Sequence, residues 1–240
     1  MDILDEPITY PEEVAAFDLS TQRDKFRIVA LGDSTTLCAR QEKGARWPDL
    51  LEAACGPISA VTNAGIGGTS SSLALFRWHR DVAPLQPHCV VINFVLNDSH
   101  IRHYECRSSY VVQCSFDRMD ANLRALVDLS RGLGAAPIFW TPPPVPPWKW
   151  EAIFKSDTHL KIQQELLHTG AAHVARVARE LEVPIADLWN RFPELVDEFP
   201  GPYFDPPDGY HSNGHSQPII ADEIAGLVKE LLPSAQGQAR

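Results

Sequence analysis

The sequence predicts an α/β protein, a three-layer α/β/α sandwich with a central, mostly parallel sheet of five strands. Two observations lead to this prediction. Short apolar, β-branched segments alternate along the chain with longer segments of helical character, which is the order found in parallel sheets covered by helices. The apolar segments also end at or near glycine, asparagine, aspartate or proline, which are the residues typical of turns.

Five segments have the composition of buried strands bounded by turns. The first is apolar and stops at Gly32, and the second stops at Asn63. The third is the most apolar, the fourth enters a run of three prolines, and the fifth is a short segment that begins with Pro184. In chain order, the strands are predicted at residues 26–31, 58–62, 90–95, 137–140 and 184–186.

Five segments are predicted as helices. In the first, Pro48 suits the first helical position and Gly56 suits a helix end. The second begins with threonine and serine residues that suit capping. The third is strongly amphipathic and is closed by Gly132 and Gly134, the fourth is the longest, and the fifth closes the chain. In chain order, the helices are predicted at residues 47–54, 69–79, 117–129, 158–181 and 217–232.

The composition of the chain is that of an ordinary globular protein, with 44% hydrophobic and 22% charged residues. Its 240 residues can form one α/β domain over residues 25–240, after a polar lead-in over residues 1–24. The formal net charge of −10 argues against nucleic acid as a partner.

The absence of a recognisable signal peptide and the pattern of cysteines both favour a cytoplasmic location. The first six residues are acidic and are not followed by the apolar core of a signal peptide, and no apolar run is long enough to span a membrane. The five cysteines form no CxxC pair, so we expect reduced thiols. A bridge between Cys106 and Cys114, in one polar loop, is the alternative.

Four separate segments carry residues suited to acyl transfer: Gly-Asp-Ser-Thr at 32–35, a glycine-rich loop at 63–68, Asn97 with Asp98, and Asp-Gly-Tyr-His at 208–211. Each is a common turn sequence on its own. Together they supply a nucleophile, Ser34, whose hydroxyl needs an imidazole to accept its proton. His211 is the candidate base, and Asp208, three residues before it, can orient and stabilise the ring.

Acyl transfer also needs donors that stabilise the oxyanion of the tetrahedral intermediate. The backbone N–H of Ser34, the N–H of a nearby glycine and the side-chain amide of Asn97 are the candidates. We interpret Asp33 and Asp98 as acceptors that tie their turns to backbone donors. Asn213 and His215 are predicted to cap the last helix.

In order and spacing, these four segments resemble the SGNH/GDSL hydrolases, a family named for its Ser, Gly, Asn and His, over residues 26–232. The resemblance implies a flavodoxin-like fold, hydrolysis of a carboxylic ester through an acyl-enzyme, and no metal or organic cofactor. It gives Gly68 the oxyanion position, with Gly67 as the competing glycine. Family members usually have glycine where this chain has Val95, which either shifts the backbone around Asn97 or reflects a differently packed strand end.

Several alternatives stay open. An acyltransferase would use the same residues, and a non-catalytic binding module would use the same scaffold. Asp205 is a rival to Asp208, and His100 with His103 lacks the further ligands that a metal site needs. Trp148 and Trp150 are candidates for a substrate wall. Residues 99–115 form either a lid or a surface loop. The small-molecule substrate is an aryl, sugar O-acetyl or short-acyl ester.

Overall fold

The computed structural model describes residues 10–104, 109–145, 157–199, 201–204 and 211–233. A sheet of five parallel strands lies at the centre, in the order β2-β1-β3-β6-β7. All five predicted strands are present, with small shifts in their ends. They are β1 (Phe26–Gly32), β2 (Ser59–Gly65), β3 (Cys89–Asn93), β6 (Ala136–Thr141) and β7 (Ile185–Asp187).

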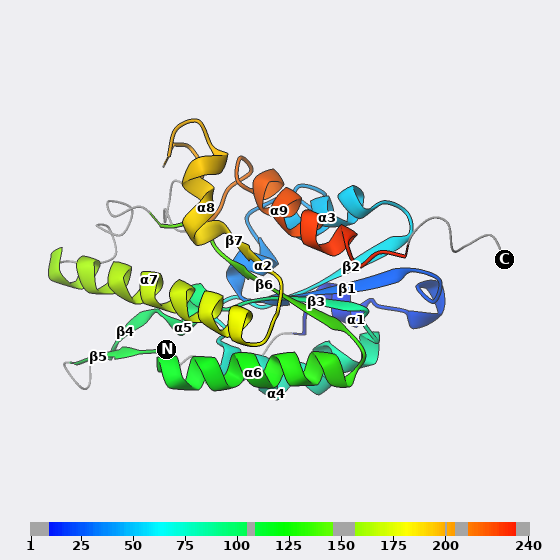
Figure 1. The fold of residues 1–240 in the computed structure, drawn as a ribbon, viewed down its shortest axis with the longest axis horizontal. Helices are drawn as coiled ribbons and strands as arrows, with labels where there is room; N and C mark the ends of the chain where they lie inside the picture. The colour runs from blue at the N-terminus through cyan, green and yellow to red at the C-terminus, as the bar shows by residue number, and fades with distance from the viewer. Residues whose placement is uncertain (1–9, 105–108, 146–156, 200, 205–210, 234–240) are drawn as a thin grey trace.

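Helices cover both faces of this sheet (Figure 1). One face carries α4 (Ser71–Asp81), α6 (Phe116–Gly132) and α7 (Asp157–Glu180). The opposite face carries α3 (Trp47–Cys55), α8 (Leu188–Leu195) and α9 (Gln217–Lys229). The predicted three-layer α/β/α sandwich is therefore confirmed.

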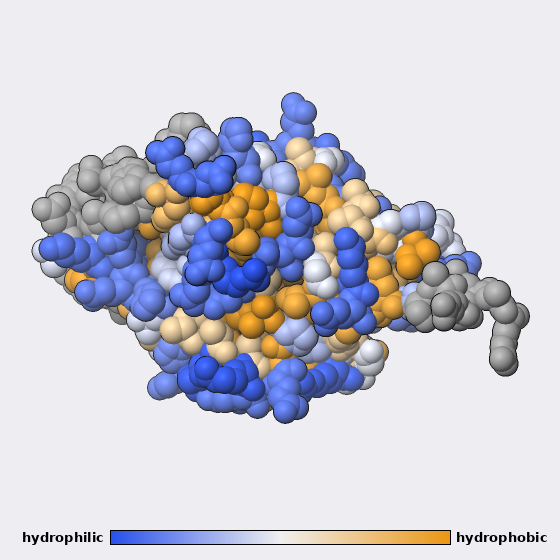
Figure 2. All heavy atoms as spheres, turned by 45° about the horizontal axis from the view of Figure 1, so that its top comes forward, coloured by the Kyte–Doolittle hydropathy of each residue, from blue (hydrophilic) through white to orange (hydrophobic). Residues whose placement is uncertain are grey.

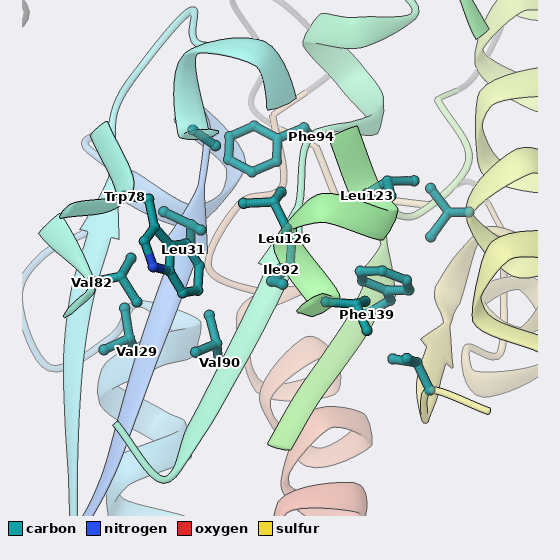
Figure 3. Packing of buried hydrophobic residues seen from close by; sticks show 14 of the residues in the cluster. Val29, Leu31, Trp78, Val82, Val90, Ile92, Phe94, Leu123, Leu126 and Phe139 are labelled. Carbon is teal, nitrogen blue, oxygen red and sulfur yellow. The ribbon is translucent and has the colours of Figure 1, made fainter. Parts of the chain in front are cut away.

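Strand side chains alternate between two apolar cores, because successive residues of a strand point to opposite faces. From β1, Val29 and Leu31 enter the core under α4 and α6, whereas Ile28 and Ala30 enter the core under α3 and α9. Burial on both faces explains why the strands are continuously apolar. Figure 3 shows the first core, in which the sheet packs against Trp78, Val82, Leu123 and Leu126.

The third strand is shorter than predicted. It ends at Asn93, and Val95 is the first residue of a short helix, α5 (Val95–Asp98). The prediction of strand up to residue 95 is wrong, because Phe94 and Val95 are buried in the core and share the apolar character of the strand without continuing its pairing.

Short elements connect the main ones. Within residues 99–115, which were predicted as a lid or a surface loop, residues 101–104 pair antiparallel with residues 109–112. A hydrogen bond from the Cys114 N–H to the Asp98 carbonyl, 3.1 Å long, ties this strand pair to α5. The short elements are α1 (Glu12–Ala15), η1 (Leu19–Thr21), α2 (Ser34–Leu37), η2 (Ala83–Leu85), β4 (Ile101–Tyr104) and β5 (Ser109–Val112).

The described part of the N-terminal lead-in packs against the sheet through α1. Val14 is buried in the same core as α4. The Glu13 carboxylate accepts a hydrogen bond from the Asn63 N–H at 2.8 Å, and it also pairs with Arg46. This segment is therefore fixed beside the carboxyl end of β2.

Figure 2 shows one face of the molecule, on which hydrophilic side chains are interspersed with hydrophobic patches. Within the described ranges, no helix combines the length and the apolar character needed to cross a bilayer. The four described cysteines, including Cys114, are buried free thiols, so Cys114 takes part in no disulfide.

The strand order determines where a ligand can bind. From β1 the chain crosses to β2 on one side, and it then returns to β3 on the other side. In open sheets of this kind, the crevice beyond the carboxyl ends of the strands on either side of such a reversal is the usual ligand site. The turns after β1 and β3 carry Ser34 and Asn97.

Candidate active site

Ser34 lies at a sharp turn between β1 and α2. Gly32 is required here, because a Cβ at this position would lie 2.0 Å from Thr36 Oγ1 and 2.9 Å from the Asn93 carbonyl oxygen. Asp33 then caps α2 by accepting hydrogen bonds from the Thr35 N–H at 2.8 Å and the Thr35 hydroxyl at 2.7 Å. The turn leaves the half-buried Ser34 side chain beyond the strand end.

The His211 ring approaches Ser34 from the far end of the chain. Its Nε2 atom lies 2.8 Å from Ser34 Oγ. The neighbouring Ser212 pairs with Phe204 in an isolated β-bridge, and Asn213 donates a hydrogen bond to the Phe204 carbonyl at 3.1 Å. These contacts hold the loop that carries the imidazole within hydrogen-bonding distance of the hydroxyl.

A buried glutamine, Gln217, joins that loop to the serine turn. Its Nε2 donates to the Ser212 carbonyl at 3.0 Å, and its Oε1 accepts from the Trp47 N–H at 2.8 Å. The Trp47 indole N–H in turn donates to the Thr35 carbonyl at 3.0 Å. Sequence reasoning missed Gln217. The available signal was a polar residue at the first position of α9, directly before the apolar residues of its first turn.

The structure corrects the predicted caps of two helices. Asn213 and His215 were expected to cap α9, but its N-cap residue is Ser216, and Asn213 instead holds the chain near Phe204. At α4, Ser70 makes no side-chain cap, and Asp98 accepts the Ser71 N–H at 2.9 Å from a distant segment.

The Asn97 amide faces the nucleophile turn. Its Nδ2 donates one hydrogen bond, 2.9 Å long, to Asp33 Oδ2, and an amide nitrogen has a second N–H to offer. Burial raises the pKa of Asp33, an effect that the hydrogen bonds from Thr35 and Asn97 partly offset. Asp33 therefore fixes both the serine turn and the orientation of the amide.

Backbone donors also surround the serine. Within the described ranges, the N–H groups of Ser34, Gly67 and Gly68 make no hydrogen bond with protein acceptors. Gly67 faces the nucleophile, since a Cβ added there would lie 3.9 Å from Ser34 Cβ. Gly68 has a φ of +72°, in the left-handed region that favours glycine. Both glycines therefore carry free donors in this loop.

Two ionisable side chains near the site, those of Arg77 and Asp98, are buried. Arg77 donates to the Ala64 carbonyl at 2.7 Å and to the Gly32 carbonyl at 2.9 Å, which links β1 to β2. Asp98 is fully buried, and burial raises its pKa to about 7, with a smaller contribution from the charge of Asp33.

Val95, which replaces the family's usual glycine, is buried at the start of α5 and would contact a Cβ added at Gly170.

Some predicted site residues lie outside the described residues. They are Asp208, its rival Asp205, and the two tryptophans of the proposed wall, Trp148 and Trp150. In the part of the chain that the structure describes, no group of three or more His, Cys, Asp or Glu side chains is arranged to hold a metal ion.

Ser34 and His211 share a small hollow of about 200 Å³. Leu37, Cys38, Gly67 and Gln217 contribute to its walls. Burial raises the pKa of the Cys38 thiol to about 12. Because the thiolate is the nucleophilic form of cysteine, Ser34 is the better nucleophile in this hollow.

Comparison with curated proteins identifies distant relatives. The chain is 28% identical over 180 residues to the uncharacterized lipoprotein YqeF of Bacillus subtilis, which covers 70% of this chain and 72% of that protein. It is 24% identical over 205 residues to thioesterase 1/protease 1/lysophospholipase L1 of Escherichia coli, which covers 85% of this chain and 84% of the relative.

Solved structures share the fold. A catalytic mutant of Axe2, an acetylxylan esterase from Geobacillus stearothermophilus, superposes with a TM-score of 0.66 at 22% identity, covering 87% of this chain and 96% of that one. The structure of TesA gives a TM-score of 0.62 at 22% identity, covering 86% and 99%. The model of the GDSL-like lipase/acylhydrolase family matches residues 30–239, and the chain therefore belongs to that family.

Proposed function

We propose that this protein hydrolyses carboxylic esters of small molecules through an acyl-enzyme intermediate on Ser34. His211 acts as the general base, and Asp208 is the carboxylate partner of its ring. The observation that carries the proposal is the 2.8 Å separation between His211 Nε2 and Ser34 Oγ, in a hollow that both residues line.

In the first half of the reaction, His211 Nε2 takes the proton of the Ser34 hydroxyl while Oγ bonds to the ester carbonyl carbon. The oxyanion that forms accepts hydrogen bonds from the Ser34 and Gly68 N–H groups and from the Asn97 amide. The intermediate then collapses, the ester C–O bond breaks, and the alcohol leaves with the proton held by His211.

In the second half, water replaces the alcohol. His211 takes a proton from water, whose oxygen attacks the acyl carbon, and the bond to Ser34 Oγ breaks as the serine regains its proton. The products are a carboxylic acid and an alcohol, and no redox change occurs.

The choice of substrates to test follows from the relatives. The names of relatives and structural neighbours include a thioesterase, a lysophospholipase and acetylxylan esterases. The hollow at Ser34, about 200 Å³, has room for a short acyl group beside the alcohol oxygen at His211.

A panel of chromogenic esters of increasing acyl length, run beside an acetylated sugar and an acyl thioester, tests the proposal. We expect turnover of acetyl and other short-acyl esters, and its loss in Ser34→Ala with an unchanged unfolding temperature. Ser130→Ala is the matched control, because Ser130 is a buried serine of α6 whose hydroxyl donates to the Leu126 carbonyl of the same helix. Full activity in Ser34→Ala would refute the proposal. Transfer of the acyl group to an added alcohol in preference to water would indicate an acyltransferase.

A further inference from the structure

The hollow at Ser34 does not end at the nucleophile. A second hollow of about 690 Å³ lies beside the first, and five residues line both. The shared residues are Leu37, Cys38, Ala39, Gln41 and Gly67. The second hollow alone falls within the ~300–1,000 Å³ typical of ligand pockets, so the pair forms a groove much larger than a short acyl group requires.

The far wall of this groove comes from the N-terminal segment. Tyr10, Glu12, Glu13 and Ala16 line the second hollow. The family match begins only at residue 30. This part of the groove is therefore built by residues that precede the family's shared region, and it is held in place by the contacts of Glu13 with Asn63 and Arg46.

The chemistry of the second hollow is polar and balanced in charge. Two carboxylates, of Glu12 and Glu13, and two cations, of Lys43 and Arg46, line it. Arg46 is occupied by Glu13 and Asp49. Among the described residues, the side chains of Glu12, Gln41 and Lys43 make no hydrogen bond or ion pair with the protein.

This lining discriminates between classes of ligand. A long acyl chain would remove the open polar groups from water without giving them partners, which costs free energy. A strongly charged ligand would meet charges of both signs. A neutral ligand rich in hydroxyl groups can both donate to a carboxylate or an amide oxygen and accept from an ammonium or amide N–H.

The position of the groove indicates which half of the ester it receives. The alcohol leaves with a proton from His211, so its oxygen must lie close to that ring. His211 and Ser212 line the first hollow, from which the second one continues. The alcohol half can therefore extend from His211 along Leu37 and Ala39 toward α1.

We infer that the groove between residues 10–16 and 37–46 binds the alcohol half of the substrate, and that this half is a neutral, polyhydroxylated chain longer than one unit, such as an oligosaccharide that carries a short acyl ester. The inference rests on the proposed ester hydrolysis. The N-terminal segment thus sets the preference for chain length, whereas Ser34 and its neighbours carry out the reaction.

The test compares two alanines of the N-terminal segment. Ala16 lines the groove and Ala15 does not, although both are exposed. For wild type, we expect kcat/KM to be higher on an O-acetylated tetrasaccharide than on the matching O-acetylated monosaccharide. Ala16→Trp fills the groove and should lower the tetrasaccharide value about tenfold, equivalent to 1.4 kcal/mol, mainly through KM. Its kcat/KM on p-nitrophenyl acetate should fall far less than on the tetrasaccharide, and Ala15→Trp should resemble wild type on every substrate.

A second variant probes the polar lining. Lys43→Met removes the ammonium donor and keeps a side chain of nearly the same length. We expect a loss of kcat/KM that is smaller than in Ala16→Trp and confined to the tetrasaccharide. Equal kcat/KM on the tetrasaccharide and the monosaccharide, with p-nitrophenyl acetate still hydrolysed, would overturn the groove assignment alone. A gain in kcat/KM with acyl chain length that Ala16→Trp abolishes would overturn it in favour of an acyl tunnel. If wild type did not hydrolyse p-nitrophenyl acetate at all, that result would instead contradict the proposed function.

Discussion

The amide of Asn97 illustrates how a single residue can serve both structure and chemistry. One of its N–H groups bonds Asp33, which itself caps the helix that begins with the nucleophile. The remaining N–H is thereby restricted in direction before any substrate arrives. Such preorganisation is what makes an oxyanion donor effective, because no further ordering is needed during the reaction.

Asn97→Ala should therefore lower kcat about a hundred- to a thousandfold on a good ester, with a smaller change in KM, since losing one oxyanion donor has this effect in acyl transfer. Initial rates over a range of substrate concentrations measure the two constants. Asn122→Ala is the control, because Asn122 is a buried asparagine that bonds Ser71 and Ser72, away from Ser34. Wild-type kcat in Asn97→Ala would show that the amide is not a donor.

Gln217 links the segment that carries His211 to the turn that carries Ser34, through its bonds to Ser212 and Trp47. We expect Gln217→Met to lower kcat about tenfold to a hundredfold, because a displacement of about 1 Å between reacting groups has costs of this size. Gln163→Met is the matched control, since Gln163 is also fully buried and bonds two backbone groups, the Ile101 N–H and the Ser99 carbonyl.

The comparison of these two glutamine variants separates positioning from stability. Both should unfold at lower denaturant concentration, because each leaves buried backbone groups without partners. Only Gln217→Met should also slow labelling of Ser34 by a fluorophosphonate at a temperature where both variants are folded. Equal labelling rates in the two variants would mean that Gln217 supports the fold and not the geometry of Ser34 and His211.

At the scale of elements, the sequence predicts best what is long or regular. The five strands and the helices α3, α4, α6, α7 and α9 all follow from apolar runs, periodicity and turn residues. The helices α2 and α5 span four residues each and cannot display a helical period. The helix α8 was not predicted, because it contains Pro193, and proline in a sequence normally indicates that a helix ends.

In the candidate site, too, the sequence predicts some features and not others. The motifs point to Ser34 and His211, and these two side chains lie together even though 177 positions separate them in the chain. The contacts of Gln217 with Trp47 and Ser212 could not be predicted, because they depend on how α9 packs against α3 and on no local pattern. The prediction that the third strand continues to residue 95 was also wrong. Phe94 and Val95 are apolar because they are buried in the core, and they do not pair with a neighbouring strand.

For the whole molecule, strand order and burial explain where the reactive groups lie. The chain reverses direction across the sheet between β1 and β3, and the hollow at Ser34 lies at this reversal, in a sheet whose two faces are covered by helices (Figure 1). Side chains from both ends of the chain line this hollow and the one beside it, with residues 10–16 on one side and His211 on the other. The same compact arrangement buries Asp98 away from water.

Burial of Asp98 should make the free energy of unfolding depend on pH. Its pKa is about 7 in the folded protein and near its ordinary 3.8 in the unfolded chain. Between these values the folded state retains a proton that the unfolded state has lost, so stability falls as pH rises. From pH 5 to pH 8 this group should reduce the free energy of unfolding by about 3 kcal/mol.

Urea unfolding of wild type and Asp98→Asn at both pH values measures this contribution. Asparagine can still accept the Ser71 N–H, so the variant should lose less stability than wild type over this interval. Asp128→Asn, which changes an exposed carboxylate of α6, is the control and should follow wild type. An identical pH dependence in wild type and Asp98→Asn would show that the Asp98 carboxyl is ionised across this range.

The central claim is that His211 activates Ser34 as the nucleophile. Its most direct test is peptide mass spectrometry after reaction with a fluorophosphonate. We expect one adduct on Ser34 in wild type, formed much more slowly in His211→Ala and absent after unfolding in urea. An unlabelled Ser34 in folded protein that hydrolyses esters, or labelling that is equally fast without the imidazole, would contradict this account.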